Sequence, residues 1–167
     1  MAGGGPHERL HDSISSFLGK NPPSEIPKKW ERFSDIAILP SGSFRDESWG
    51  DIVGPDLWKA VAQGLNVERL GMMGEVTGRI RKSGVKMLLG DDDWVVRREN
   101  GVYYGYHVTK CMFSAGNVNE RRRMGDIARR GEVVVDLFAG IGYYSLPILV
   151  HSEVCLLYTS PSPRDRG

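Results

Sequence analysis

The chain has few cysteines, no long apolar run and almost no net charge, and each of these absences excludes a class of protein. Only two of its 167 residues are cysteines, Cys111 and Cys155, so the sequence predicts neither a disulfide framework nor a cysteine-rich metal site. No apolar run of about twenty residues occurs, so we expect no membrane-spanning helix and no membrane partner. The N-terminus lacks the apolar core of a secretory signal, and we therefore expect a cytoplasmic protein.

The formal net charge of +1 hides a local excess of positive charge. Residues 110–130 include six basic and two acidic side chains, which gives this stretch a net charge of +4. The more common interpretation of such a run is a solvated helix face. The alternative is a surface that contacts RNA phosphates. On this alternative, the candidate RNA-binding residues are Arg122, Arg123, Arg129 and Arg130.

The acidic residues and histidines do not predict a metal site. The four histidines are scattered along the chain. Asp91, Asp92 and Asp93 follow one another, but no further ligand completes a coordination shell. We therefore interpret the three aspartates as a turn between two strands, and we expect no bound metal.

Changes in local pattern divide the chain into four segments. Apolar residues at helical spacing predict helices over 8–19 and 55–65. Strands are predicted at 34–40, 74–81, 85–91, 94–98 and 102–108. The predicted segments are an N-terminal helix and linker over 1–25, a small α+β module with a meandering sheet over 26–109, the truncated start of a Rossmann-like domain over 110–154 and a tail over 155–167.

A further helix is predicted from Asn117 to Gly131, and it carries most of the basic residues. Asn117 and Glu120 have the spacing of a capping box, in which two side chains bind the free N–H groups at a helix start. Met124 and Ile127 supply an apolar face. Gly131 is a typical helix stop.

The segment VVVDLFAGIGYYSL, over 133–146, combines the features of a cofactor-binding turn. Its near-continuous apolar run predicts a strand over 133–139 that is buried on both faces of a parallel sheet. Asp136 follows three valines, and Gly140 and Gly142 allow the backbone to pass close to a ligand before a helix begins. Ser145 replaces the third glycine of the dinucleotide fingerprint, so the pattern fits methyltransferases that use S-adenosyl-L-methionine. The ordinary alternative is a strand–turn–helix unit without a ligand.

Several motifs, taken in order, resemble the tRNA wybutosine-synthesizing protein 2 family. They are YHVTKCMFSAGNVNERRRM and VVVDLFAGIGYYSLP, preceded by WERFSDIAILP and LLGDDDWVVRRENGVYYGYHVT, which resemble the smaller domain of that family. The resemblance covers residues 26–152. A related family, the tRNA guanine-N1 methyltransferases that act beside the anticodon, usually has Phe-Ser-x-Arg-Leu at the helix start. This chain has Gly116 and Asn117 there, which favours the wybutosine family.

The resemblance implies an enzyme of tRNA modification that needs no metal. Such an enzyme transfers the 3-amino-3-carboxypropyl group of S-adenosyl-L-methionine to carbon 7 of 4-demethylwyosine, beside the anticodon of phenylalanine tRNA, and releases methylthioadenosine. The implied fold class is α/β, with a small α+β module followed by the start of a Rossmann-like class I methyltransferase-type domain. The alternatives are the guanine-N1 methyltransferase activity and an RNA-binding piece without catalysis.

The resemblance also implies which residues contact the cofactor, although it assigns no catalytic residue. They are Ser114, Arg121, Asp136, Phe138, Ala139, Gly140 and Gly142. The guanidinium of Arg121 suits the methionine carboxylate, whereas family members often have a lysine there, which offers a point charge in place of a planar fork. Considered without the resemblance, Ser114 is an ordinary turn or cap residue and Arg121 is a solvated helix position.

The last residues, CLLYTSPSPRDRG over 155–167, do not continue the pattern of an open α/β domain. Such a domain requires a second strand whose terminal acidic residue holds the cofactor ribose, and we expect no strand here. Residues 155–165 also match the translation of a common transposase-adapter DNA used in sequencing. We therefore interpret the segment as a non-native tail, with a disordered native tail as the alternative.

We predict that the chain as written neither binds S-adenosyl-L-methionine measurably nor transfers a group from it. The physical reason is that we expect no neighbouring strands on either side of strand 133–139 and no sheet for helix 141–151 to cover. Isothermal titration calorimetry measures the affinity directly. A dissociation constant in the micromolar range would contradict the prediction.

Overall fold

The structure is a computed structural model that describes residues 4–74, 84–111, 113–114 and 116–159. Its contacts divide the chain into two compact units. The first consists of Met1–Val95 and His107–Met112, and the second consists of Val96–Tyr106 and Phe113–Gly167. Among the described residues, no helix has both the length and the apolar character that crossing a membrane requires.

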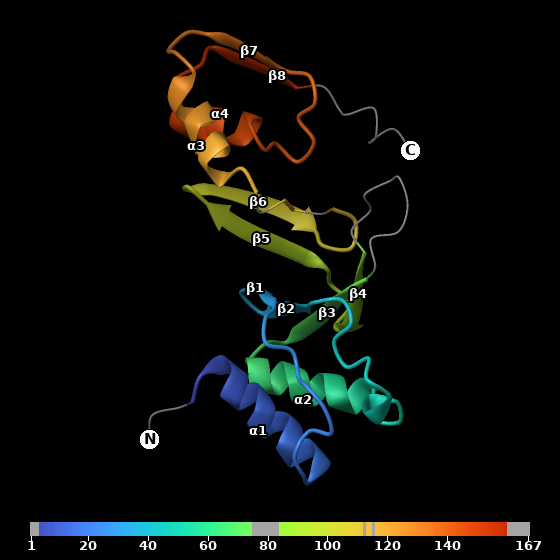
Figure 1. Cartoon of the computed structure of the whole chain (residues 1–167). Coiled ribbons are helices and arrows are strands. Elements are labelled where there is room, and N and C mark those ends of the chain that lie inside the picture. Colours follow the sequence, from blue (N-terminus) through green and yellow to red (C-terminus); the bar gives the residue numbers. More distant parts are fainter. Residues whose placement is uncertain (1–3, 75–83, 112, 115, 160–167) are drawn as a thin grey trace. The chain divides into compact units, whose positions relative to one another are not determined.

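The first unit is built on a four-stranded sheet and two long helices (Figure 1). Its elements are α1 (Pro6–Leu18), β1 (Glu31–Phe33), β2 (Ile36–Leu39), the short 3-10 helix η1 (Glu47–Trp49), α2 (Pro55–Leu65), β3 (Arg69–Met73) and β4 (Val85–Leu89). The strand order is β1-β2-β3-β4. β2 and β3 are parallel, whereas the other two pairs are antiparallel. α2 packs against β3 and β4, and α1 packs against α2.

The predicted meandering sheet is wrong at its centre. β2 and β3 run in parallel, and α2 forms the crossover connection that parallel neighbours require. β3 and β4 are antiparallel, and β3 spans Arg69–Met73, before the strand predicted at 74–81. The predicted strand at 74–81 lies, from residue 75 onwards, outside the described residues. The sequence patterns therefore located β2 and β4, whereas β1 and β3 lie outside the predicted strand ranges.

The core of the first unit confirms both helix predictions. α2 has the predicted bounds, and its Leu57 and Val61 are fully buried. Leu10 and Ile14 of α1 are also fully buried and belong to the same apolar cluster. Phe17 of α1 is 42% exposed and lies along the groove between α1 and α2.

The two helices of the first unit come close together at Gly64. A Cβ atom added there would lie 2.8 Å from the Cα of Leu10 and 3.1 Å from the carbonyl oxygen of Arg9. Nearby, the hydroxyl of Ser13 donates a hydrogen bond to the carbonyl oxygen of Ala60 at 2.7 Å, so the two backbones are held together. The packing of α1 on α2 therefore depends on the absence of a side chain at position 64.

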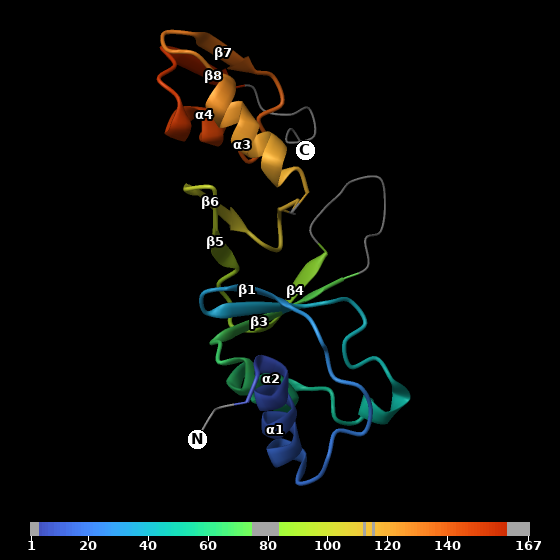
Figure 2. The same ribbon diagram turned by 60° about the vertical axis from the view of Figure 1, so that its left-hand side comes forward.

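The second unit contains most of a β-hairpin and a strand–helix–strand arrangement (Figure 2). Its elements are β5 (Trp94–Glu99), β6 (Val102–His107), α3 (Val118–Ile127), β7 (Val133–Asp136), α4 (Ser145–His151) and β8 (Leu156–Thr159). β5 pairs with β6 through Asn100 and Gly101, and both residues have positive φ, as a two-residue hairpin turn requires. β7 and β8 are parallel, and α3 packs against α4.

The expectation that no strand follows α4 is wrong. β8 pairs in parallel with β7, with Val133 opposite Leu156 and Asp136 opposite Thr159. The short apolar stretch at residues 156–158 is sufficient to extend the sheet, and α4 forms the crossover between the two strands. The non-native origin of residues 155–167 is a separate question and stays a prediction.

The predicted burial of strand 133–139 on both faces is also wrong. Val133 and Val135 are 54% and 57% exposed, and Leu137, beyond the end of β7, is 60% exposed. Figures 1 and 2 show α3 and α4 on the same side of the β7–β8 pair. A sheet is buried on both faces only if a layer covers each face, and the described part of this unit places helices on one face.

We expect Gly64→Ala to destabilise the first unit by about 1–3 kcal/mol, because the added methyl group would force α1 away from α2. Urea denaturation followed by tryptophan fluorescence measures the change in the free energy of unfolding. The matched control is Gln63→Ala, an exposed neighbour on the same helix, which should change that free energy by less than about 0.5 kcal/mol. Equal stabilities for the two variants would contradict the proposed contact.

Candidate functional site

The glycine-rich turn between β7 and α4 is held by the side chain of Asp136. One carboxylate oxygen of Asp136 accepts a hydrogen bond from the backbone N–H of Phe138 at 3.2 Å. The other accepts one from the hydroxyl of Ser145, at the start of α4, at 2.5 Å. Gly140 and Gly142 have φ angles of 54° and 84°, a backbone region that glycine enters without strain. The predicted turn is therefore present, and Asp136 fastens its two ends.

Arg121, in α3, is buried and forms an ion pair. Only 3% of its surface is exposed. Its Nε and Nη2 donate to the two carboxylate oxygens of Glu99 at 2.5 and 2.9 Å, and its Nη1 donates to the carbonyl oxygen of Gly116 at 2.6 Å. The hydrogen bonds to Glu99 raise the pKa of Arg121 against the opposing effect of burial. The charge of this arginine is therefore compensated within the second unit.

Aromatic rings surround this ion pair. The guanidinium carbon of Arg121 lies 5.3 Å from the ring centre of Phe113 and 5.1 Å from that of Tyr143, within the range of cation–π contacts. The rings of Phe113 and Tyr143 meet edge to face at 5.2 Å between centres. Burial also raises the pKa of the neighbouring Tyr104 hydroxyl. We call Glu99, Phe113, Arg121 and Tyr143 the arginine cluster.

The arginine cluster joins the two sequence segments that carry the predicted cofactor residues. The hydroxyl oxygen of Tyr143 accepts a hydrogen bond from the backbone N–H of Ser114 at 2.6 Å. Because Tyr143 follows Gly142, this bond fastens the segment before α3 to the glycine-rich turn. Ala139 is half-buried, whereas Phe138 is 71% exposed. The structure therefore brings Ser114 and the turn together and leaves the ring of Phe138 accessible.

The predicted capping box at the start of α3 is wrong. Asn117 has a φ of 61° and makes no side-chain cap hydrogen bond. A capping side chain requires an extended backbone at its own residue, which this positive φ excludes. Glu120 instead forms an ion pair with Arg123 at 2.6 Å. α3 ends at Ile127, which is 48% exposed, before the predicted stop at Gly131.

Two of the four candidate RNA-binding arginines are already paired with acidic side chains. Arg123 is paired within α3, and the Nε of Arg130 lies 3.1 Å from a carboxylate oxygen of Glu153. Arg122 and Arg129 are exposed, and no carboxylate in the described part of the chain pairs with either guanidinium. Among these four arginines, the positive charge that no acidic side chain of the described residues compensates therefore lies on Arg122 and Arg129.

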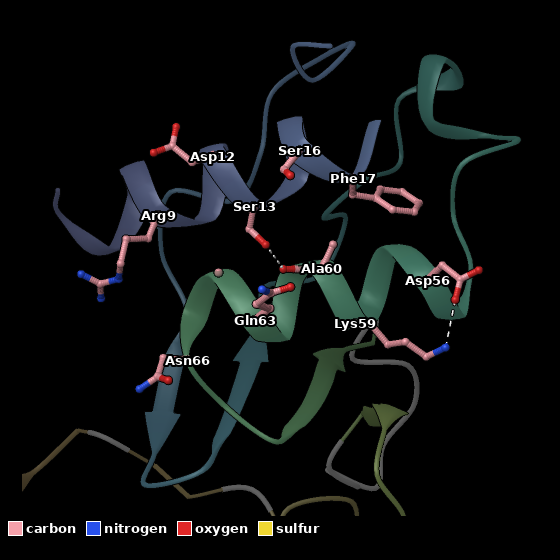
Figure 3. Close-up of a pocket in the computed structure, with 11 residues that line it drawn as sticks. Arg9, Asp12, Ser13, Ser16, Phe17, Asp56, Lys59, Ala60, Gln63 and Asn66 are labelled. Carbon is pink, nitrogen blue, oxygen red and sulfur yellow. Dashed lines mark hydrogen bonds and ion pairs between the residues drawn. The ribbon is translucent and has the colours of Figure 1, made fainter. Parts of the chain in front are cut away.

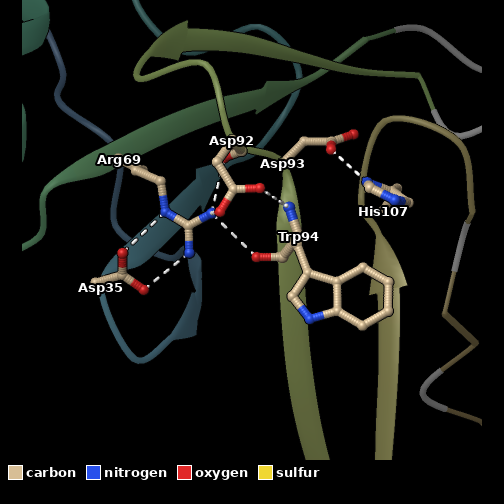
Figure 4. Close-up of polar contacts among 6 residues, drawn as sticks. All are labelled: Asp35, Arg69, Asp92, Asp93, Trp94 and His107. Atoms are coloured by element: carbon tan, nitrogen blue, oxygen red, sulfur yellow. Dashed lines mark hydrogen bonds and ion pairs between the residues drawn. The ribbon is translucent and has the colours of Figure 1, made fainter.

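A second paired arginine, Arg69, lies in the first unit (Figure 4). Its Nε and Nη2 donate to the two carboxylate oxygens of Asp35 at 2.8 and 2.9 Å, and its Nη1 donates to the carboxylate of Asp92 at 2.9 Å. These hydrogen bonds lower the pKa of Asp35. Asp92, in the predicted acidic turn, therefore binds an arginine of the protein itself. Across the described ranges, no cluster of three or more acidic, histidine or cysteine side chains is arranged for a metal ion.

Asp93 forms a separate polar cluster beside this network. One of its oxygens lies 2.6 Å from the Nδ1 of His107, and the other accepts a hydrogen bond from the hydroxyl of Thr109 (Figure 4 draws the first contact). The bond from Thr109 is the main cause that lowers the pKa of Asp93 to about 2, and His107 adds to it against the effect of burial. The ring of His107 also meets that of Trp94 edge to face at 5.1 Å between centres.

The groove between α1 and α2 is a further hollow of the first unit (Figure 3). Its lining includes Arg9 and Lys59 as well as Asp12 and Asp56. Lys59 and Asp56 pair with each other at 2.9 Å. Because charges of both signs line the groove, it has no electrostatic preference for a ligand of one sign. We therefore place the candidate site at the arginine cluster and the glycine-rich turn.

Sequence reasoning missed Glu99, Phe113 and Tyr143. Glu99 precedes a hairpin turn, where acidic residues are usually solvated, and its partner Arg121 lies 22 positions further along the chain. One feature of the sequence could have indicated the buried arginine, namely that α3 has few apolar residues. Its buried positions are Arg121 and Gly125, four residues apart, so packing one face of this helix buries an arginine that needs an acidic partner.

Two family models match consecutive parts of the chain. The TYW2 N-terminal domain matches residues 10–93, and the TRM5/TYW2 methyltransferase domain matches residues 95–160. The boundary between the two matches lies beside Val95, after which the structure also passes from the first unit to the second. Sequence similarity and spatial organisation therefore place one division at the same point of the chain.

Curated relatives match most of this chain with a small part of their own length. The tRNA wybutosine-synthesizing protein 2/3/4 of Arabidopsis thaliana is 45% identical over 159 residues, which cover 92% of this chain and 16% of the relative. The tRNA wybutosine-synthesizing protein 2 homolog of Homo sapiens is 40% identical over 136 residues, which cover 81% of this chain and 30% of the relative. The chain thus spans less than a third of the length of either relative.

A solved structure has the same fold. P. horikoshii TYW2, crystallised in complex with MeSAdo, aligns with a TM-score of 0.66 and 33% identity over 92% of this chain and 55% of that chain. This alignment and the methyltransferase-domain match confirm the predicted fold class, an α/β chain whose second part is of the Rossmann-like methyltransferase type.

We expect Asp93→Asn to lower the free energy of unfolding by about 1–2 kcal/mol at about pH 7, because the neutral amide cannot accept charge-assisted hydrogen bonds. The pKa of Asp93 is lowered from 3.8 to about 2. Its contribution is therefore complete above about pH 4 and is lost as the pH falls through about 2. Urea denaturation at neutral and low pH measures the difference. The control is Asp91→Asn at the same turn, and a loss that does not depend on pH would contradict the assignment.

Proposed function

The chain belongs to the TYW2 family of tRNA wybutosine-synthesizing proteins, and from this premise we propose that it forms the N-terminal module and the first part of the cofactor domain of an S-adenosyl-L-methionine-dependent tRNA transferase. The observation that carries the proposal is the consecutive match of the two family models over residues 10–93 and 95–160. The first of these models names TYW2 alone, whereas the second is shared with TRM5. The first unit therefore favours the wybutosine branch.

The proposed reaction transfers the 3-amino-3-carboxypropyl group of S-adenosyl-L-methionine to carbon 7 of 4-demethylwyosine in phenylalanine tRNA. The bond between the sulfonium sulfur and the γ-carbon breaks, a carbon–carbon bond to carbon 7 forms, carbon 7 loses its proton, and methylthioadenosine is released. S-Adenosyl-L-methionine supplies three activated carbons on its sulfonium. The protein selects the reacting carbon by holding it in line with the nucleophile.

The second unit has features that fit this cofactor. The positive φ angles of Gly140 and Gly142 bring bare backbone to the surface of the turn, where a ligand can approach closely. The exposed ring of Phe138 offers an apolar face for an adenine. Ser114 is fastened to the turn through the hydroxyl of Tyr143. Arg121 keeps two guanidinium N–H groups without an acceptor among the described residues, which leaves a contact with the cofactor carboxylate open.

A labelling experiment with the full-length gene product tests the reaction. S-Adenosyl-L-methionine carries label either on the carboxyl carbon or on the methyl group, and the acceptor is phenylalanine tRNA that contains 4-demethylwyosine. We expect only the carboxyl label to reach the tRNA. Transfer of the methyl label would favour the second candidate, a tRNA guanine-N1 methyltransferase. Tight tRNA binding without transfer of either label would favour an RNA-binding role.

The basic surface of α3 and the residues after it is the proposed contact with tRNA phosphates. Arg122 and Arg129 supply it, because Arg123 and Arg130 are paired with acidic side chains. The proposal therefore assigns the two unpaired arginines a larger share of the binding energy than the two paired ones. A solvated helix face without RNA contacts is the competing interpretation of the same charges.

We expect the double variant Arg122→Ala/Arg129→Ala to weaken tRNA binding at every sequence tested and to reduce its dependence on salt. Each lost phosphate contact should lower the slope of log affinity against log salt by roughly 0.7–0.9. Fluorescence anisotropy of labelled tRNA with the 167-residue chain, at several salt concentrations, measures both quantities. Lys59→Ala, which removes one paired lysine from the first unit, is the control. An unchanged slope in the double variant would show that these arginines do not contact phosphate.

A further inference from the structure

We propose that the open face of the β5–β6 hairpin is a stacking surface for an unpaired nucleobase of the tRNA. Tyr103 is the ring on which the base stacks, and Arg98 is the cation that orients this ring and contacts the adjoining phosphate. The inference rests on the proposed function, in which tRNA is the substrate. It adds a contact with a base to the phosphate contacts of Arg122 and Arg129.

The part of the hairpin that belongs to the second unit has one buried face and one open face, because side chains alternate between the two faces along a strand. The buried face of β6 is formed by Val102, Tyr104 and Tyr106. On the open face, Val96 is 51% exposed and Tyr103 is 63% exposed. The solvated face of an antiparallel pair is usually polar, whereas this one presents an aliphatic and an aromatic side chain beside a cation.

Arg98 and Tyr103 contact each other across the two strands. The guanidinium carbon of Arg98 lies 5.6 Å from the ring centre of Tyr103, within the range of cation–π contacts, so the cation orients the ring before a ligand binds. Arg98 is exposed, and no carboxylate in the described part of the chain pairs with it. The adjacent Glu99 binds Arg121 instead. An exposed ring and an uncompensated charge therefore lie side by side.

A ring beside an uncompensated cation matches the two parts of a nucleotide. Every nucleobase has an aromatic face that can stack on tyrosine, and a guanidinium can neutralise the phosphate that follows the base. The base has to be unpaired, because bases inside a duplex stack on one another. An apolar protein surface would match Tyr103 but would leave the charge of Arg98 without a partner. The surface therefore fits a tRNA loop better than a tRNA stem or a protein.

The hairpin is fixed to the helices beside the glycine-rich turn. The Nδ2 of Asn100 donates a hydrogen bond to a backbone carbonyl at the start of α3 at 3.5 Å, and the Nε2 of His151, at the end of α4, lies 2.7 Å from the carbonyl oxygen of Asn100. Glu99 adds its ion pair with Arg121 of α3. A base bound on the open face is therefore held by the same unit that carries the predicted cofactor residues.

The test compares two labelled RNAs of equal length with the 167-residue chain, by fluorescence anisotropy. One is a stem-loop with the anticodon loop of phenylalanine tRNA, and the other is a fully paired duplex. We expect Tyr103→Ala to weaken binding of the stem-loop about five- to hundredfold and to leave binding of the duplex unchanged, because the duplex offers no free base. Tyr103→Phe keeps the ring and should bind as the wild type does.

The matched control is Tyr158→Ala. Tyr158 is a second exposed tyrosine of the same unit, with 56% exposure against 63% for Tyr103. Its removal should leave both affinities unchanged. Thermal unfolding establishes that each variant is folded at the assay temperature. If Tyr103→Ala does not fold, Tyr103→Leu keeps the apolar bulk without an aromatic ring and should show the same selective loss.

The dependence of binding on salt separates the roles of the two side chains. Tyr103→Ala should leave the slope of log affinity against log salt unchanged, because the ring neutralises no phosphate. Arg98→Ala should lower this slope by roughly 0.7, the value for one phosphate contact on a single strand, and Arg98→Lys should restore it. An unchanged slope in Arg98→Ala would overturn the phosphate contact.

A fluorescent base analogue reports the stacking directly. 2-Aminopurine is placed at successive positions of the loop, and its emission falls when it stacks on an aromatic ring. We expect the wild type and Tyr103→Phe to reduce the emission at one loop position and Tyr103→Ala to leave it unchanged there. Equal emission with all three proteins at every position would contradict stacking on Tyr103.

The remaining outcomes separate this surface from the proposed function. Unchanged stem-loop binding in Tyr103→Ala would overturn the stacking surface alone and would favour a protein contact at this face. Equal weakening of stem-loop and duplex would also overturn it, because a loss of that kind does not depend on a free base. A wild type that binds neither RNA would overturn the proposed tRNA contact on which the inference rests.

Discussion

The salt bridge between Glu99 and Arg121 is the constraint on which the second unit depends. Transfer of a guanidinium from water to a buried site without a partner costs several kcal/mol. α3 can therefore bury its inner face only where a carboxylate lies opposite that guanidinium. Glu99 provides that carboxylate at the end of β5, immediately before the hairpin turn. The bridge therefore determines which end of the hairpin lies against α3. The rings of Phe113 and Tyr143 exclude water from the pair and strengthen it.

The first unit also contains an arginine that is paired with carboxylates, and there the pairing connects separate parts of the fold. Arg69 of β3 binds Asp35, before β2, and Asp92, in the turn between β4 and β5. One planar side chain thus ties three parts of the fold that lie far apart in sequence. Packing in this unit depends on small size as well as charge, because α1 and α2 approach each other over Gly64. In the second unit, Gly142 has a comparable role at the turn, where an added Cβ would lie 2.7 Å from the side chain of Leu146.

The features that were predicted correctly from the sequence are those that depend on residues close together along the chain. The periodicity of residues 55–65 identified α2 with its bounds, and the pattern from Asp136 to Gly142 identified the turn. Features that depend on distant partners were predicted poorly. The parallel pairing of β2 with β3, the presence of β8 and the exposure of β7 follow from which segments meet in space. The cofactor and RNA residues came from resemblance and charge, and their individual roles stay predictions.

The sequence alone determined the family of this chain, because several motifs occur in one order, and it determined the glycine-rich turn, because few residue types tolerate that backbone. Only the tertiary structure showed the environment of Arg121. By sequence it was either a solvated helix residue or a cofactor ligand, and its environment shows a buried, compensated charge. The physical reason is that the energy of a charge depends on its distance from other charges and from water. Those distances are set by the packing of β5, α3 and the turn. This packing cannot be predicted from a local sequence pattern.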